Sequence, residues 1–219
     1  MSMTEDEYAY EEYMAQLYEE HKAEAIEAFI YDRLLSYYNE NRLLAKPAFG
    51  VIKEAQNLLA INATAGFIFS AIAMEVGLKE TLLKPIVFGL VHVASSASLV
   101  TNLVMAHRSM DRYKALLLQI LRDHGGVDLL SYKRRGSSKT IWEEIISVQT
   151  KRNLILHTAQ TASSEEANLA LAVASTIIGE LFPAIVTKMG LHLHDGFRIC
   201  DDSKCECKGT NMEKILDIT

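Results

Sequence analysis

The 219-residue chain has few residues that interrupt helices and few that form cross-links. It contains 3 prolines and 11 glycines, so we expect long helices rather than many short strands. Its 3 cysteines all fall between positions 200 and 207. An odd number of cysteines in one short segment excludes a disulfide framework across the domain and favours a reducing compartment.

Positive charge is also scarce. The chain has 22 lysines and arginines against 28 acidic residues, a net charge of -6, which excludes a broad nonspecific nucleic-acid coat but allows a local basic patch. The N-terminal residues MSMTEDEYAY have no basic region followed by an apolar stretch, so we expect no signal peptide and a cytoplasmic protein. Residues 85–106 and 167–187 are long enough for a membrane span, but their polar interruptions favour buried helices and no membrane association.

Apolar residues recur at spacings of three and four along most of the chain, which predicts an all-α fold. We expect a bundle of about five to six helices with a long N-terminal helix and a short irregular C-terminal tail. Residues 1–47 form an acidic helix packed on the core, residues 48–190 the bundle, and residues 191–219 a polar tail that holds the cysteines. The predicted helices cover about 5–46, 49–82, 86–107, 110–124, 141–157 and 163–189, with breaks at Pro47 and Pro85.

Local signals mark two helix starts and one loop. Thr140 and Glu143 have the spacing of a capping box, as do Ser163 and Glu166, so each pair predicts a helix N-terminus. The loop over residues 125–140 precedes the first of these helices. It holds the strongest basic cluster of the chain, which includes Lys133, Arg134 and Arg135. These three residues are candidate RNA-backbone ligands, and the alternative is a solvated loop.

Residues 151–157, KRNLILH, combine groups suited to RNA cleavage. Asn153 and His157 are four residues apart and share one helix face, whereas Arg152 lies well round the cylinder. The RNA 2′-hydroxyl is an internal nucleophile, so a histidine base near neutral pH can start the reaction without a metal. Arginine suits the charge that develops on the phosphorane oxygens, and an amide could orient the imidazole or bind a phosphate oxygen. We expect the aliphatic residues 154–156 to be buried.

The pattern R-N-x-x-x-H at the end of a helix, after TIWEEIISVQ and before ASSEEANLALAVA, resembles the HEPN superfamily of all-α ribonucleases. The segment FSAIAMEVGLKETLL resembles an earlier core helix of that family. The similarity covers roughly residues 50–190 in helix order and motif. It implies a metal-independent endoribonuclease, often a toxin or antiviral defence effector, that acts as a homodimer with its motifs meeting across the interface.

The resemblance also assigns roles to individual residues. Arg152 and His157 become the catalytic pair, Asn153 a supporting catalytic residue, and Glu75 a supporting residue on the earlier helix. No metal or other cofactor is implied. One departure is Ala159, because some toxins of this superfamily carry a tyrosine there that a partner nucleotidyltransferase modifies. That modification is therefore in doubt, while an antitoxin or other regulatory partner stays open.

Other interpretations remain open. Arg152 and His157 could be ordinary surface and helix-end residues, and Glu75 could be the structural partner of a buried arginine. The chain would then be a catalytically silent HEPN-like module that binds a partner protein or a nucleotide, or, in a third interpretation, a membrane-associated helical protein. The tail has enough soft ligands for tetrahedral zinc, although its C-x-C spacing matches no familiar knuckle and a polar tail is the commoner outcome. These ligands are His192, His194, Cys200, Cys205 and Cys207.

Overall fold

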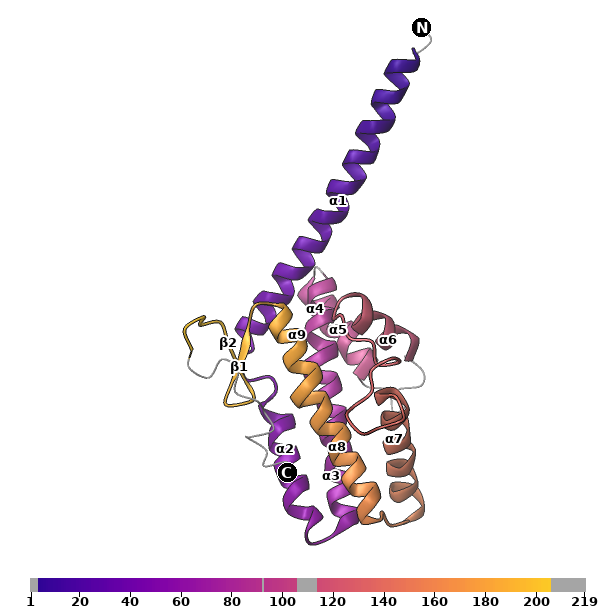
Figure 1. Cartoon of the computed structure of the whole chain (residues 1–219), viewed down its shortest axis with the longest axis vertical. Helices are drawn as coiled ribbons and strands as arrows, with labels where there is room; N and C mark the ends of the chain where they lie inside the picture. The colour runs from indigo at the N-terminus through magenta and orange to yellow at the C-terminus, as the bar shows by residue number, and fades with distance from the viewer. Residues whose placement is uncertain (1–3, 92, 106–113, 206–219) are drawn as a thin grey trace.

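The computed structural model describes residues 4–91, 93–105 and 114–205. The described residues form seven helices, two of which contain a π-helical segment, and one small hairpin (Figure 1). The all-α class and the long N-terminal helix are therefore confirmed. The elements are α1 Glu5–Glu40, α2 Lys46–Leu59, α3 Ala63–Val76, η1 Gly77–Leu83, α4 Lys84–Leu90, α5 Ala94–Met105, α6 Lys114–Asp123, α7 Ile141–Thr158, α8 Ser164–Thr176, η3 Ile177–Leu181, α9 Phe182–Lys188, β1 His192–His194 and β2 Arg198–Cys200.

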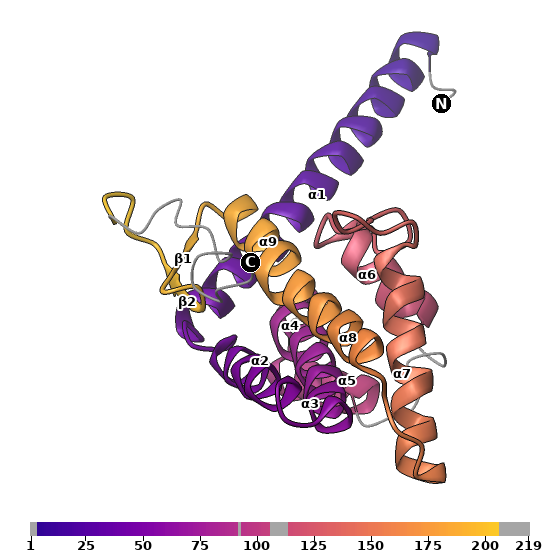
Figure 2. The same ribbon diagram turned by 60° about the horizontal axis from the view of Figure 1, so that its bottom comes forward.

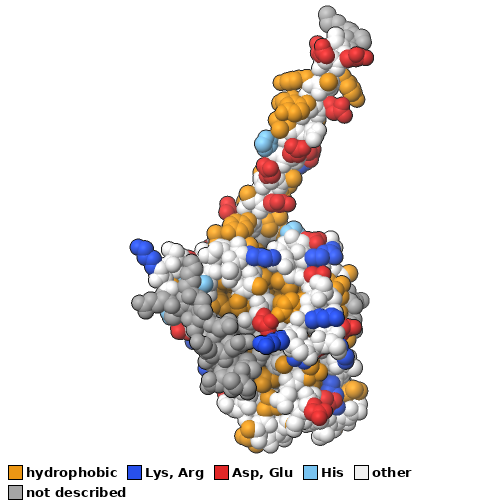
Figure 3. Space-filling model, viewed as in Figure 1, with side chains coloured by type: hydrophobic (Ala, Val, Ile, Leu, Met, Phe, Trp, Pro, Cys, Tyr) orange, Lys and Arg blue, Asp and Glu red, His pale blue; other side chains and the backbone are white. Residues whose placement is uncertain are grey.

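Helix α1 projects from the body for most of its length (Figures 1 and 3). A capping box between Thr4 and Glu7 begins the helix. Only its last turns pack on the core, where Leu34 and Tyr38 are buried against the bundle. Residues 1–47 were expected to pack on the core, but the apolar side chains of the projecting part do not line one face, and most stay exposed.

Two long helices lie side by side at the centre of the molecule. One consists of α3, η1 and α4, and the other of α8, η3 and α9 (Figure 1). At their starts the Ala162 amide donates to Thr64 Oγ1 at 3.0 Å. Halfway along, Gly77 lies against the second helix so closely that an added Cβ would stand 3.0 Å from Ile178 Cγ1. The two helices therefore run parallel and touch at their π-helical segments.

Pro85 was predicted to end or kink a helix over 49–82, and that expectation is wrong. The helix instead breaks at Ala60, and Asn62 caps α3 by accepting from the Ala65 amide at 3.0 Å. A proline within a helix removes a hydrogen bond and crowds the preceding turn. In each central helix a π-helical turn, which is wider, comes directly before the short stretch that contains the proline, so the helix continues through Pro85 and Pro183.

Both predicted capping boxes are present in full. The Thr140 hydroxyl accepts from the Glu143 amide while the Glu143 carboxylate accepts from the Thr140 amide, and Ser163 and Glu166 form the same pair at the start of α8. Helix α7 packs against both central helices through a buried apolar stripe, and α2 packs on them as well. Figure 2 shows α7 along the side of the bundle, next to α8.

The sequence suggested an irregular C-terminal tail. The start of the tail instead forms the antiparallel hairpin β1–β2. The hairpin is fixed to the end of α1 and to α2. The Ile199 amide donates to the Arg42 carbonyl at 2.9 Å, Arg42 pairs with Asp201 at 2.7 Å, and the rings of Phe197 and Phe49 lie 5.3 Å apart. Residues 206–219, including Cys207, lie outside the described part of the chain.

One described helix, Ser164–Lys188, is long and apolar enough to cross a membrane by length and composition alone. It overlaps the stretch 167–187 that the sequence marked, and 56% of its most apolar window is buried inside the protein. It is one of the two central helices of the bundle, and core helices pass the same test.

Candidate functional site

The position of Arg152 is set by the buried stripe of α7. Ile141, Ile145 and Val148 are buried at spacings of four and three, and the next positions of that stripe are Arg152 and the half-buried Ile155. Arg152 therefore occupies a place on the core-facing side of the helix, where an apolar residue would ordinarily stand. Its charge has to be matched from inside the protein.

Glu75, near the end of α3, supplies that match. Arg152 Nη1 lies 3.3 Å from Glu75 Oε1, and the two side chains are 27% and 18% exposed. Arg152 Nε is buried and has no acceptor among the described residues, so the fold leaves the guanidinium only partly satisfied. The structure thus brings together two residues that the resemblance assigned to one site. The same contact is also what a purely structural arginine–glutamate pair would show.

Asn153 and His157 point the other way. Both are exposed, they share one side of α7, and neither has a hydrogen bond or an ion pair within the described residues. On an ideal helix His157 is rotated from Arg152 by about 140° and displaced by about 7.5 Å along the axis. One chain therefore does not bring the arginine and the histidine to the same point.

The aliphatic residues 154–156 do not all lie in the core. Leu154 is 40% exposed and Leu156 is 56% exposed, and only Ile155 is half-buried. The expectation that all three are buried was wrong because consecutive helix residues are about 100° apart, so three of them cannot face one side. The outward face of α7 consequently presents two leucines close to Asn153 and His157.

Helix α7 ends at Thr158. Ala159 caps it with a left-handed backbone, φ 54°, and its amide donates to the Ile155 carbonyl at 3.1 Å. His157 therefore lies in the last turn, where unpaired carbonyl groups favour a positive charge.

The turn from α7 to α8 is locked by a pair that sequence reasoning did not single out. Lys151 Nζ lies 2.9 Å from Glu166 Oε1, and Glu166 also accepts from the Ser163 amide at 2.8 Å. The hydrogen bond from Ser163 and then the contact with Lys151 lower the pKa of the Glu166 carboxyl. Lys151 and Glu166 are 15 positions apart, and only the capping box hinted that Glu166 had a fixed place.

The basic loop lies at the opposite end of α7. The Ile141 amide donates to the Tyr132 carbonyl at 2.8 Å, which holds Lys133 beside the first turn of the helix. From Ile141 to His157 the helix rises by about 24 Å. The structure therefore does not bring Lys133, Arg134 and Arg135 together with the RNxxxH segment.

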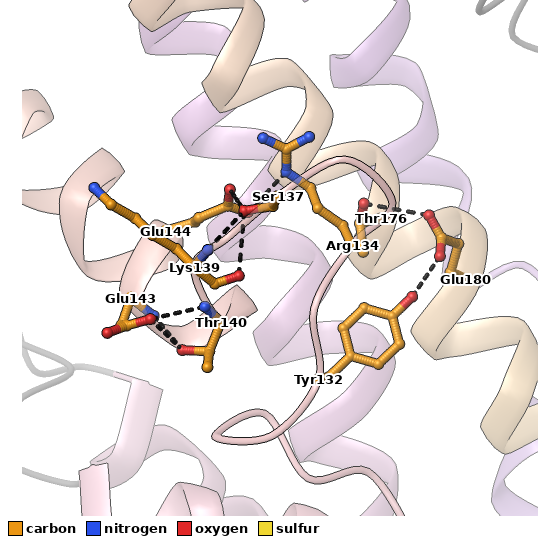
Figure 4. A network of polar contacts seen from close by, with 9 residues as sticks. All are labelled: Tyr132, Arg134, Ser137, Lys139, Thr140, Glu143, Glu144, Thr176 and Glu180. Atoms are coloured by element: carbon orange, nitrogen blue, oxygen red, sulfur yellow. Dashed lines mark hydrogen bonds and ion pairs between the residues drawn. The ribbon is translucent and has the colours of Figure 1, made fainter.

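Arg134, the central cation of this loop, already pairs with a carboxylate of the protein (Figure 4). Arg134 Nε donates to Glu144 Oε2 at 2.8 Å, and Ser137 Oγ donates to Glu144 Oε1 at 2.7 Å. Glu144 is only 3% exposed, and a buried carboxylate needs such partners. Lys133 and Arg135 are exposed and remain candidates for RNA contact.

A second contact of the loop joins it to the second central helix. The Tyr132 hydroxyl donates to Glu180, whose other oxygen lies 3.3 Å from Thr176 Oγ1 (Figure 4). Burial, and then this hydrogen bond, raise the pKa of Tyr132 above its ordinary value. The loop is therefore fastened at two points, by Glu144 and by Glu180.

Comparison of the chain with protein-family models, curated proteins and solved structures found no match. The resemblance to the HEPN superfamily therefore depends on the residues quoted from the sequence. The contact between Arg152 and Glu75 and the exposure of His157 are the structural observations that bear on it.

Proposed function

We propose that the protein is a metal-independent endoribonuclease that cleaves RNA through its 2′-hydroxyl, as a toxin or antiviral defence effector would. One observation carries the proposal. His157, the candidate base, is exposed at the end of α7 without a partner in the described parts of the chain, while Arg152 of the same segment is held at the edge of the core by Glu75. The imidazole is available to a ligand, and the cation has a fixed place.

The reaction needs a base and an acid. His157 takes the proton from the 2′-hydroxyl, the 2′-oxygen attacks the adjacent phosphorus, and the bond from phosphorus to the 5′-oxygen breaks. A second imidazole, in its protonated form, gives a proton to the leaving 5′-oxygen. The products are a 2′,3′-cyclic phosphate and a 5′-hydroxyl, and neither water nor a metal ion enters this step.

Arg152 and Asn153 support the reaction in different ways. A guanidinium has five N–H donors, so Arg152 keeps donors for phosphate oxygens beyond its contact with Glu75. Glu75 fixes the direction of the guanidinium, which makes it a positioning residue. Asn153, on the same side of α7 as His157, orients the imidazole or binds a phosphate oxygen.

A homodimer would complete the site. Arg152 and His157 diverge round α7, and one chain contributes a single histidine to this segment. An isologous interface along the outward face of α7 would bring two His157 side chains together, with one serving as base and the other as acid. The exposed Leu154 and Leu156 beside them offer the apolar surface for such an interface.

The test is incubation of purified protein with RNA in EDTA, followed by analysis of the product ends. Wild type should cleave and leave 2′,3′-cyclic phosphates, and His157→Ala should lose about a hundredfold or more in rate. His21→Ala is the matched control, because His21 is an exposed residue of α1, far in sequence from α7. Products with 5′-phosphates, or activity that EDTA abolishes and Mg²⁺ restores, would refute the mechanism.

Substrate contact by the basic loop is part of the proposal, through Lys133 and Arg135 rather than Arg134. Each phosphate contact contributes a slope of about 0.7 to the dependence of log affinity on log salt for single strands. Lys133→Ala with Arg135→Ala should therefore lower that slope by up to about 1.4. The exposed pair Lys22→Ala and Lys46→Ala is the charge-matched control. An unchanged slope would make the loop a solvated surface.

The second candidate is a catalytically silent HEPN-like interaction module that binds an antitoxin, another regulatory protein or a nucleotide. The exposed leucines at positions 154 and 156 favour it, because they form a contact surface whether or not His157 reacts. This candidate predicts that the double variant Leu154→Ser, Leu156→Ser no longer binds the partner protein. It also predicts that wild type cleaves no RNA in the assay above.

A further inference from the structure

The start of the C-terminal tail gathers side chains that bind metals. Strands β1 and β2 pair antiparallel with His192 opposite Cys200, so these two side chains are cross-strand neighbours on one face of the hairpin. His194 is two residues further along β1 and shares that face. The hairpin thus presents two imidazoles and one thiol together.

The chain then returns to the same place. After β2 a short turn brings Cys205 back, and ligand atoms of His192, Cys200 and Cys205 all lie within 4.8 Å of one another. Cys205 Sγ is 3.3 Å from His194 Nδ1. Cys200 and Cys205 are free thiols. Three nitrogen and sulfur donors from two strands and one turn therefore converge, and the His194 imidazole contacts one of them, Cys205.

The hydrogen bonds of the fold do not account for this cluster. His192 Nε2 is buried and has no hydrogen-bond partner in the described parts of the chain, and a buried polar atom without a partner needs an explanation. His194 Nε2 lies 3.3 Å from Asp195 Oδ2. A carboxylate on the outer nitrogen is the usual second-shell partner of a histidine that binds a metal through its other nitrogen.

We propose that His192, Cys200, Cys205 and His194 bind one Zn²⁺ ion as a structural site. Two thiolates and two neutral imidazoles are a standard zinc set, and the two thiolate charges balance the ion. Ligand atoms of a tetrahedral zinc site stand about 3.3–3.8 Å apart, from Zn–N and Zn–S lengths of about 2.0 and 2.3 Å. The ligand atoms of His192, Cys200 and Cys205, which lie within 4.8 Å of one another, therefore need to approach by about 1 Å, His194 has to turn towards the same point, and binding releases the two thiol protons.

The site has a structural task. The hairpin is tied to the bundle through Arg42 and Phe49, and zinc would fasten the following turn, up to Cys205, onto that hairpin. The hairpin and α7 lie on opposite sides of the central helices (Figures 1 and 2). The ion is therefore not part of the proposed ribonuclease reaction, and the two proposals fail independently.

The experiment measures metal in the full chain, purified with reductant and without chelator. We expect about one zinc per chain, and Co²⁺ in its place should give the visible bands of a tetrahedral site and a thiolate-to-cobalt charge-transfer band. Cys200→Ser and Cys205→Ser should each lose the zinc, and cobalt added to either variant should give at most the charge-transfer intensity of one thiolate instead of two. Arg198→Ala, an exposed change in the same hairpin, should keep both.

The cobalt spectrum of wild type needs no variant, so a cysteine variant that fails to fold cannot hide the answer. Wild type without zinc and without a tetrahedral cobalt spectrum would overturn the proposal. So would a Cys200–Cys205 disulfide in protein alkylated at cell lysis, or full zinc in the double cysteine variant. Full zinc in His194→Ala would remove His194 from the ligand set. If metal-free protein keeps its helical content and still cleaves RNA, zinc has no part in the ribonuclease reaction.

Discussion

Each end of α7 has a short run of cations and polar residues in the sequence, but the contacts of these side chains differ between the two ends. At the first end Arg134 and Ser137 are bound to the buried Glu144, so that the polar groups satisfy one another. At the last end Asn153 and His157 are exposed without a partner among the described residues. Arg152 is an intermediate case. It pairs with Glu75, but its buried Nε has no acceptor among the described residues.

This difference between the two ends of α7 separates side chains that stabilise the fold from side chains that contribute little to its stability. Removing Arg134 would leave a buried carboxylate unpaired, which costs stability. Removing His157 would leave the packing as it is, because an exposed side chain without contacts contributes little to stability. A large effect of His157 on function without an effect on folding would therefore be evidence of chemistry at that end.

The largest expected effect concerns the shared site. In mixed dimers of wild-type and His157→Ala chains, independent sites would retain about half of the activity, whereas a site that uses both histidines should fall about a hundredfold. Mixed dimers with His21→Ala should stay fully active. Half-activity, or a monomer that is fully active at high dilution, would contradict the shared site.

The next effect tests the first end of α7. Arg134→Ala should lower the free energy of unfolding by about 3 kcal/mol, because Glu144 is left buried without its cation. Urea denaturation measures this value. Arg135→Ala, next in the chain but exposed, should change it by about 0.5 kcal/mol or less. Replacing Glu144 by leucine in the Arg134→Ala background should recover most of the loss. Equal effects of Arg134→Ala and Arg135→Ala would refute the buried pair.

Arg152 should show an intermediate result. Arg152→Ala should lower stability by about 1–2 kcal/mol, less than Arg134→Ala, because the pair with Glu75 is partly exposed. It should also slow RNA cleavage at saturating substrate, and Arg152→Lys should restore stability better than rate, since lysine lacks the planar fork. A loss of stability with an unchanged rate would assign Arg152 a structural role only.

The smallest effects belong to the capping boxes. Hydrogen bonds from Thr140 and Ser163 lower the pKa of Glu143 and Glu166. A carboxyl whose pKa is lowered by folding stabilises the native state at neutral pH, and this stabilisation is lost as the pH falls through the lowered value. Glu143→Gln and Glu166→Gln should therefore reduce the drop in Tm between about pH 7 and about pH 3.

The effect should be larger for Glu166, which also contacts Lys151. Glu165→Gln, in the same first turn of α8, is the control because it has no capping contact in the described structure. An equal change in all three variants would contradict a specific role of the caps. Thr140→Ala and Ser163→Ala should each lower the free energy of unfolding by about 1 kcal/mol.

Features that depend on neighbours in sequence could be predicted. The two capping boxes, the loop over 125–140 and the span of α7 follow from side chains three or four positions apart, and the structure confirms them. The resemblance joined Glu75 to Arg152, which is 77 positions away, and the structure places the two in contact.

Features that depend on distant partners could not be predicted. The π-helical turns that carry the central helices through Pro85 and Pro183 arise where the two helices pack closely at Gly77. The pairing of Arg134 with Glu144 turns a surface cluster into an internal contact. The tail was expected to be an irregular polar segment, and no spacing rule connects His192 with Cys205, which a hairpin and a turn bring together.

The most direct test measures cleavage rate and unfolding free energy together for His157→Ala and Arg134→Ala. We predict opposite results. His157→Ala should lose about a hundredfold or more in rate with stability unchanged within about 0.5 kcal/mol. Arg134→Ala should lose about 3 kcal/mol in stability and keep its rate wherever it remains folded. A His157→Ala protein that cleaves RNA at the wild-type rate, or that loses its helical fold, would contradict the assignment of the reaction to the last turn of α7.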